Sequence, residues 1–299
     1  MASGVGVLVA ERIAAALVDD HQIAGAVQTF PSDGITADAL LGLPAEVIVE
    51  KIVEVVGPIL SETRLDCVGV GFPGIVRNGA IQDSPNLVQL KGQPMQTMLE
   101  SALRQFAGDI FVSIFNDADV VAAGLAATRG QLDRLIRVWT LGNGIGYGRY
   151  PFLEGIWEGG HLVVSLDPKE QYCGCGGRGH LEGIMGNRAM RLRFMDLEPE
   201  EVFELAGKGE QRCVDFVKTW HRALAAATAN NIHLDGPGKF FITGMNAGFL
   251  NVSLLSEYLH EMVKLSPLQG YALEVVPGGE EIALVGAAVN AKQAQSRHG

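Results

Sequence analysis

The chain has 299 residues, of which 47% are hydrophobic, enough to build the buried core of one large domain or two smaller ones. Its formal net charge of -11 argues against binding to a nucleic-acid backbone, because proteins that do so gather lysine and arginine on one face. No apolar run reaches the ~20 residues of a membrane-spanning helix, and residues 1–6 lack the basic start and long apolar run of a secretory signal. We therefore expect a cytoplasmic protein without a nucleic-acid or membrane partner.

The first part of the chain alternates short apolar runs with polar breaks. Three runs, Val5–Ala10, Ile13–Val18 and Ile23–Val27, are interrupted by the polar residues Asp19–His21 between the last two, which predicts an antiparallel β-meander. Between Pro44 and Leu60 the apolar residues recur at helical spacing with charged residues in the gaps. This spacing predicts an amphipathic helix that Pro44 begins.

Two predicted strands end in loops that carry polar or glycine residues. Leu65–Gly71 has the pattern of a buried strand, and Phe72–Gly74 ends it with a proline and a glycine. The second strand, Ile110–Phe115, leads into the acidic segment Asn116–Asp119 and then into the alanine-rich helix Val120–Thr128. Loops at strand ends are a usual place for a site, so both loops are candidates.

The rest of the chain continues the alternation of strands and helices. Val138–Leu141 and Phe240–Thr243 are typical of strands, and Val214–Asn231 and Ile282–Gln293 are helical by alanine content and spacing. Repeated β-then-α order favours an α/β architecture.

Cysteine and histidine gather in one segment. Cys173 and Cys175 are one residue apart, which suits a metal site better than a disulfide, and His161 and His180 flank them. Thiolate and imidazole are ligands that zinc prefers, and four of them complete a tetrahedral structural site. The hypothesis is one structural zinc per chain, held by these four residues. The alternative is a glycine-rich turn with two free thiols and two surface histidines.

Acidic residues form a second group of candidates: Asp117, Asp119, Glu158 and Glu182. A carboxylate can hold sugar hydroxyls, and one next to a hydroxyl can accept its proton during phosphate transfer. Taken singly, each is more often a solvated surface charge.

Residues 141–148 form a glycine-rich run in which every second residue is glycine. Such glycines allow backbone N–H groups to approach phosphate oxygens, although a hairpin without a ligand has the same pattern. The spacing is neither the dinucleotide fingerprint nor the P-loop.

Taken in order, these segments resemble the ROK (repressor, open reading frame, kinase) family of sugar kinases and sugar-responsive repressors. The matching segments cover most of the chain, and five ordered motifs make chance similarity implausible. They are Gly69–Gly74 with Ser84–Leu87, Asn116–Asp119, Leu141–Gly146, Glu158–His161, and Cys173–Glu182.

The resemblance implies an α/β chain with the actin-like, hexokinase-type (ribonuclease H-like) fold, in which two domains close over a cleft. We expect an N-terminal domain of residues 1–117, completed by a C-terminal helix at about 278–299, and a larger domain of residues 118–277 with the zinc site. The resemblance also implies a homodimer.

The implied activity is transfer of phosphate from ATP, with magnesium, to a hydroxyl of a hexose or amino sugar, usually the 6-OH, with Asp117 as the general base. The implied sugar-binding residues are Gly74, Asn86, Asn116, Asp117, Glu158, His161 and Glu182. Those implied for the nucleotide are Gly142, Asn143, Gly144 and Gly244.

The chain also departs from the family pattern. The phosphate motif Asp-x-Gly-Gly-Thr aligns with Val7–Glu11, which brings a carboxylate towards the phosphates, where like charges repel. Asn143 replaces a threonine, Thr243–Asn246 replaces a Gly-Gly loop, and His180 takes the place of a cysteine ligand.

Three functions therefore stay open: a kinase with an altered phosphate grip, a sugar-binding protein that transfers no phosphate, and a protein with non-phosphoryl sugar chemistry. The particular sugar also stays open. A repressor is disfavoured, because the strand pattern starts at Val5 and leaves no room for a DNA-binding domain before it.

Overall fold

The computed structural model describes residues 3–32, 39–153, 155 and 158–298, and the chain forms two compact units. The first unit comprises Met1–Ile136, Gly148–Ile156 and Gly279–Gly299, and the second comprises Arg137–Tyr147 and Trp157–Gly278. Strands and helices alternate along the chain, so the α/β architecture is confirmed. Among the described residues, no helix combines the length and the apolar character needed to cross a bilayer.

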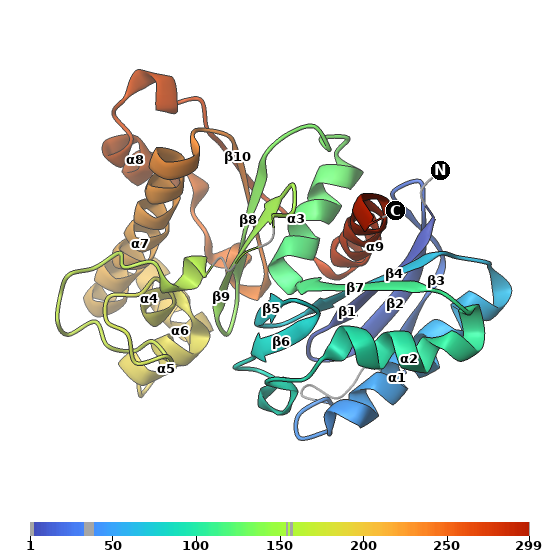
Figure 1. Ribbon diagram of the computed structural model, residues 1–299. Coiled ribbons are helices and arrows are strands. Elements are labelled where there is room, and N and C mark those ends of the chain that lie inside the picture. Colours follow the sequence, from blue (N-terminus) through green and yellow to red (C-terminus); the bar gives the residue numbers. More distant parts are fainter. Residues whose placement is uncertain (1–2, 33–38, 154, 156–157, 299) are drawn as a thin grey trace. The chain divides into compact units, whose positions relative to one another are not determined.

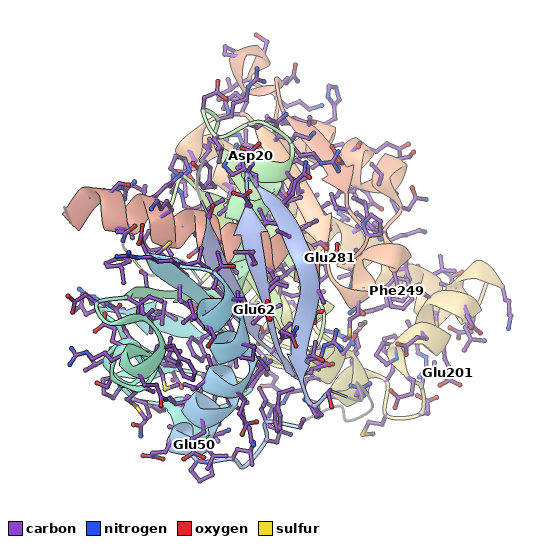
Figure 2. All side chains as sticks on the ribbon, turned by 90° about the vertical axis from the view of Figure 1, so that its right-hand side faces the viewer. Asp20, Glu50, Glu62, Glu201, Phe249 and Glu281 are labelled. Carbon is purple, nitrogen blue, oxygen red and sulfur yellow. The ribbon has the colours of Figure 1, made fainter. Side chains whose placement is uncertain are left out.

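The first unit is built on a five-stranded sheet with the order β3-β2-β1-β4-β7. Strands β1, β4 and β7 are parallel, and β2 and β3 pair antiparallel to their neighbours, which confirms the predicted meander. The turn between β2 and β3 consists of Asp20 and His21, whose φ angles of 45° and 65° suit a tight two-residue hairpin; Figure 2 labels Asp20 there. The strands are β1 (Gly4–Val9), β2 (Ile13–Asp19), β3 (Gln22–Phe30), β4 (Cys67–Phe72) and β7 (Phe111–Asn116).

Two pairs of helices cover the two faces of this sheet: α1 and α2 on one, α3 and α9 on the other (Figure 1). Alternation of glycine and valine along β1 explains the close approach of α9. Val5 and Val7 belong to the core cluster that also contains residues of α1 and α2. On the other face of the sheet, a Cβ at Gly6 would lie 1.8 Å from the carbonyl oxygen of Leu284 in α9. The helices are α1 (Ala45–Glu62), α2 (Met95–Ala107), α3 (Asp117–Thr128) and α9 (Glu280–His298).

Helix α1 begins directly after Pro44, as predicted, and its Glu50 and Glu62 are exposed (Figure 2). Helix α3 begins at Asp117, three residues earlier than predicted, because the side chain of Asn116 caps it. A small two-stranded sheet and a short 3-10 helix complete the unit: β5 (Ile75–Arg77), β6 (Ala80–Asp83) and η1 (Val88–Leu90).

Helix α3, which the sequence analysis placed in the second domain, packs against α9 within the first unit. Glycines allow the contact: a Cβ at Gly286 would be 1.7 Å from the carbonyl oxygen of Val120, and one at Gly124 would be 1.8 Å from that of Ile282. The backbones of the two helices therefore touch.

The second unit contains a four-stranded sheet with the order β11-β10-β8-β9. Only residues 142–144 separate β8 from β9, so Gly146 and Gly148 of the glycine-rich run lie within a strand rather than in the turn. The strands are β8 (Ile136–Leu141), β9 (Ile145–Tyr150), β10 (Lys239–Thr243) and β11 (Ala272–Val275). The helices are η2 (Gly159–His161), α4 (Glu182–Met185), α5 (Asn187–Arg193), α6 (Pro199–Gly207), α7 (Gln211–Asp235), η3 (Met245–Phe249), α8 (Val252–Met262) and η4 (Ser266–Leu268).

Arg137 and His221 are buried polar side chains of this unit that hydrogen-bond to backbone atoms. The Arg137 guanidinium donates to the carbonyl oxygens of Asn231 and Gly236 at the end of α7 and lies 4.0 Å over the ring of Phe240. His221 donates from Nδ1 to a carbonyl of α7, and its Nε2 accepts from a backbone N–H before α8, so the neutral ring joins these two helices.

Candidate functional site

In the first unit, Asn116 joins three segments at the end of β7. Its Nδ2 donates a 2.8 Å hydrogen bond to the carbonyl oxygen of Gly74, and its Oδ1 accepts a 2.8 Å bond from the N–H of Ala118. Asp117 follows as the first residue of α3, half-buried, with its Oδ1 also 2.9 Å from that N–H. A helix N-terminus stabilises a negative charge, so Asp117 is presented as a carboxylate at the edge of the sheet.

Gly74 fits a position that other residues cannot take. Its φ is 100°, and a Cβ there would lie 2.2 Å from the carbonyl oxygen of Asp83. The loop that starts at Ser84 and carries the exposed Asn86 therefore lies directly against the Gly74 turn. Of the residues that the sequence analysis assigned to sugar binding, this unit brings Gly74, Asn116 and Asp117 together, with Asn86 on the adjoining loop.

The turn between β1 and β2 contains Ala10 and Glu11, with which the sequence analysis aligned the end of a phosphate motif. It is closed by a 2.9 Å hydrogen bond from the N–H of Ala10 to the carbonyl oxygen of Arg12. The Arg12 guanidinium forms two bonds to Glu280 at the start of α9, of 2.9 and 2.7 Å, and these raise the pKa of Arg12. The sequence analysis noted Glu11 in this turn but missed Arg12, because Glu280, the partner of Arg12, lies 268 residues away in the chain.

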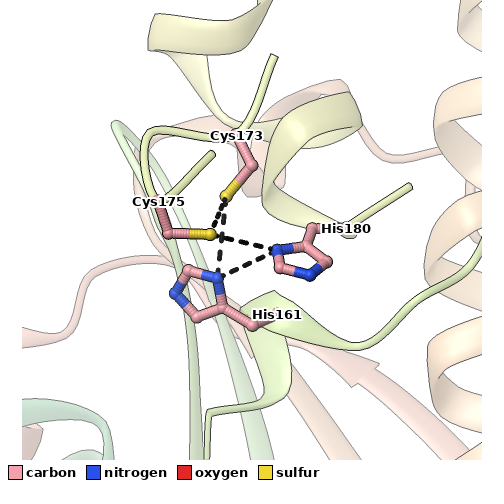
Figure 3. A group of neighbouring side chains, drawn as sticks. All are labelled: His161, Cys173, Cys175 and His180. Atoms are coloured by element: carbon pink, nitrogen blue, oxygen red, sulfur yellow. Dashed lines mark hydrogen bonds between the residues drawn. The ribbon is translucent and has the colours of Figure 1, made fainter. Parts of the chain in front are cut away.

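In the second unit, the four predicted metal ligands come together (Figure 3). Their ligand atoms all lie within 4.8 Å of one another. The two histidine Nδ1 atoms are 3.2 Å apart and the two sulfurs are 3.4 Å apart. Two of the four sulfur–nitrogen pairs measure 3.6 and 3.3 Å. The residues are His161, Cys173, Cys175 and His180.

This donor set can hold a metal ion. Bond lengths of about 2.05 Å to nitrogen and 2.3 Å to sulfur give tetrahedron edges of about 3.3 Å between nitrogens and about 3.8 Å between sulfurs. Of the six edges, the four with the distances above lie within about 0.4 Å of the ideal values, and the remaining two are no longer than 4.8 Å. Burial, with help from His161, lowers the pKa of His180 and keeps its ring neutral, as a ligand must be. Burial raises the pKa of the Cys173 thiol to about 12, and a bound cation acts in the opposite direction.

Two carboxylates predicted to bind sugar lie next to this cluster. Glu158 Oε2 lies 3.7 Å from Nε2 of His161, the ring nitrogen turned away from the other ligands, and Glu182 Oε1 lies 3.8 Å from the sulfur of Cys173. The other oxygen of Glu182 accepts a 3.0 Å hydrogen bond from the N–H of Ile145, the first residue of β9. A Cβ at Gly144 would be 2.7 Å from that same oxygen, so this glycine makes room for Glu182.

The residues assigned to the nucleotide lie in two loops that meet in the second unit. Gly142, Asn143 and Gly144 form the turn after β8, and Gly244 follows β10 with a φ of 100°. A Cβ at Gly244 would lie 2.3 Å from the carbonyl oxygen of Leu141.

The sequence analysis missed the polar pair that joins these loops to α5. Asn246 donates from Nδ2 to Oδ1 of Asn187 at 2.6 Å and, at 3.4 Å, to the carbonyl oxygen of Gly142. Both asparagines are buried, and the sequence gives no sign that two residues 59 apart form a pair.

Comparisons with known proteins agree with this geometry. The ROK family model matches residues 10–294. The glucokinase of Pyrobaculum calidifontis is 26% identical over 251 residues, covering 78% of this chain and 81% of its own. An N-acetylmannosamine kinase of Haemophilus influenzae is 27% identical over 263 residues, covering 82% of this chain and 84% of its own.

A solved structure, the ROK hexokinase of Thermus thermophilus, has a TM-score of 0.77 and 25% identity, with 99% of this chain and 100% of that chain covered. The expected actin-like, hexokinase-type fold is thereby confirmed. The chain belongs to the ROK family.

Proposed function

We propose that this protein is a sugar kinase that transfers phosphate from ATP to a hydroxyl of a hexose or an amino sugar. The observation that carries the proposal is the end of β7, where Asn116 is held on Gly74 and caps α3, so that Asp117 is presented as a half-buried carboxylate. The relatives that match most of this chain are named for glucokinase and N-acetylmannosamine kinase activity, which favours the same reaction.

In the proposed reaction Asp117 accepts the proton of the attacking sugar hydroxyl as the phosphate is transferred. Asn116, Glu158 and Glu182 hold other hydroxyls of the sugar and orient it. Magnesium supplies charge neutralisation on the transferred phosphate when it is bound. The turn at residues 142–144 and the loop at Gly244 offer backbone N–H groups to the nucleotide. Arg12 supplies a positive charge in the turn between β1 and β2.

In the proposed kinase, the cysteine and histidine cluster binds a structural zinc ion. The two neighbouring carboxylates, Glu158 and Glu182, lie against the ligands His161 and Cys173. Groups next to metal ligands are commonly oriented by them. A homodimer, expected from the family resemblance, remains part of the proposal.

A kinetic experiment tests the function. Purified protein is assayed for ADP release with ATP, magnesium and a panel of glucose, mannose, N-acetylglucosamine and N-acetylmannosamine. We expect turnover with at least one sugar and a loss of about 100- to 10,000-fold in kcat for Asp117→Asn, the range for a general base.

Calorimetry and a matched variant give the controls. Asp117→Asn should still bind the sugar, and Asp109→Asn, which changes an exposed aspartate of the same unit, should turn over like the wild type. Sugar binding without nucleotide binding at millimolar ATP would contradict phosphoryl transfer. Undiminished kcat in Asp117→Asn would contradict the assignment of the base.

Elemental analysis tests the metal site. We expect about one zinc per chain in protein purified without chelators, and a fall in zinc content and in unfolding temperature for His180→Gln. His260→Gln, at an exposed histidine of α8, is the control and should keep both. Full unfolding temperature in His180→Gln, with no zinc in the wild type, would rule out the structural metal.

A further inference from the structure

Helix α3 carries a second carboxylate that the proposed chemistry does not use. Asp119 lies in the first turn of α3, two residues after Asp117, and only 6% of it is exposed. Its Oδ1 accepts a 3.0 Å hydrogen bond from the backbone N–H of Arg149 in β9. Aspartates are seldom buried to this extent, so the position requires a physical reason.

The packing of α3 does not require this carboxylate. A Cβ at Gly148 would lie 1.9 Å from the carbonyl oxygen of Ala118, so β9 and α3 already touch through their backbones. Further along, α3 meets α9 at Gly124 and Gly286 (Figure 1). These close backbone contacts fix the position of the helix without any charged group. A buried charge, in contrast, costs free energy. An ionised Asp119 therefore weakens the fold, which is a common property of functional residues.

The surroundings of Asp119 couple it to Asp117. Burial raises the pKa of Asp119 to about 7; the amide of Arg149 lowers it, the charge of Asp117 raises it, and the charge of Arg149 lowers it. Asp117 and Arg149 are thus the charged groups that Asp119 faces. Like charges repel, so the charge of an ionised Asp119 acts on the carboxylate of Asp117.

We propose that Asp119 is a positioning residue for phosphoryl transfer. It holds the first turn of α3 on the amide of Arg149, sets the direction of the Asp117 carboxylate and places a second negative charge beside it. The inference rests on the proposed function, since it needs Asp117 to accept the substrate proton. A directed hydrogen bond restricts rotation of that turn in a way that glycine contacts do not, and a base displaced by about 1 Å can lose about 100-fold in rate.

Two substitutions separate the bond from the charge. Asp119→Asn keeps an oxygen acceptor for Arg149 and removes the charge. Since the pKa of Asp119 is about 7, we expect the wild-type kcat/KM profile to show an inflection near pH 7 that Asp119→Asn lacks. Asp119→Ala removes both, and we expect kcat to fall about 10- to 100-fold with the sugar KM changed by less than about 3-fold. Asp109→Asn is the control and should behave like the wild type.

Thermal unfolding and NMR give readouts that a purely structural role would not produce. Asp119→Asn should unfold at or above the wild-type temperature at pH 8, since it loses a buried charge. In a ¹³C carboxyl titration, the Asp117 resonance should shift near pH 7, where Asp119 ionises; this shift should be absent from Asp119→Asn and kept in Asp109→Asn, whether or not turnover is measured.

The outcomes distinguish this inference from the kinase proposal. The inference is overturned if the wild type shows neither the inflection nor the Asp117 shift near pH 7, or if both persist in Asp119→Asn. It is also overturned if the kcat of Asp119→Ala falls only in proportion to the folded fraction. Both results leave the kinase proposal in place if Asp117→Asn is inactive. Full turnover in Asp117→Asn overturns both, because Asp119 then has no base to position.

Discussion

The crossing of α3 and α9 depends on Gly286, and replacing this glycine with alanine tests the packing of the first unit. An added Cβ would lie 1.7 Å from the carbonyl oxygen of Val120 and 2.5 Å from the nitrogen of Gly124. Ordinary contacts between such atoms are about 3.5 Å, so the helices would have to separate by more than about 1 Å. Both obstructing atoms belong to helix backbone, which cannot rotate away as a side chain can.

Two opposing effects set the magnitude. Alanine is the better helix former by about 1 kcal/mol. Overpacking of a dense core typically costs about 1–3 kcal/mol, and a backbone obstruction belongs at the upper end, about 3 kcal/mol. The net loss expected for Gly286→Ala is therefore about 2 kcal/mol. Gly207→Ala is the matched control, because that exposed glycine at the end of α6 has no atom within 4 Å of its added Cβ, and it should gain up to about 1 kcal/mol.

Thermal unfolding followed by far-UV circular dichroism measures the difference. At about 2–4 °C per kcal/mol, Gly286→Ala should melt about 4–8 °C below the wild type, and Gly207→Ala at or slightly above it. If Gly286→Ala proves as stable as Gly207→Ala, α3 and α9 are not in backbone contact and the reasoning fails.

Two further predictions concern the buried polar groups of the second unit. Burial lowers the pKa of His221, so the stability of its neutral form is present above the usual value of 6.5 and is lost as pH falls through the lowered value. Urea midpoints should accordingly drop between pH 7 and pH 5 more in the wild type than in His221→Gln, and parallel curves would count against this role. Arg137→Met leaves the carbonyl oxygens of Asn231 and Gly236 without their donor and should cost about 3 kcal/mol, with Arg137→Lys in between. Equal urea midpoints for Arg137→Met and the wild type would show that this buried guanidinium does not stabilise the fold.

Much of the local structure could be predicted because it follows from neighbouring residues. Apolar spacing and turn residues predict the β-meander, the helix that begins after Pro44 and the strand Ile110–Phe115, which the structure has as Phe111–Asn116. The start of α3 was placed three residues late, because a predicted helix was counted from its apolar part and the cap was overlooked.

The metal cluster could also be anticipated, although its ligands are spread over twenty residues of loop. The types of its side chains point to a metal wherever they meet, so Cys173 and Cys175 with two histidines sufficed to name the set. What could not be predicted is that Glu182 reaches from this cluster to the N–H of Ile145, since that bond depends on how β9 packs beside α4.

By itself the sequence determined the alternation of strands and helices, the identity of the metal-ligand set and the acidic segment after β7, because each follows from residue type and short spacing. Only the tertiary structure decided which distant groups meet: Arg12 with Glu280, Asn187 with Asn246, and Asp119 with the amide of Arg149. Such pairs arise from the crossing of whole elements. Glycines such as Gly148 and Gly286 permit these crossings, and their role is visible only when the opposing backbone is in place.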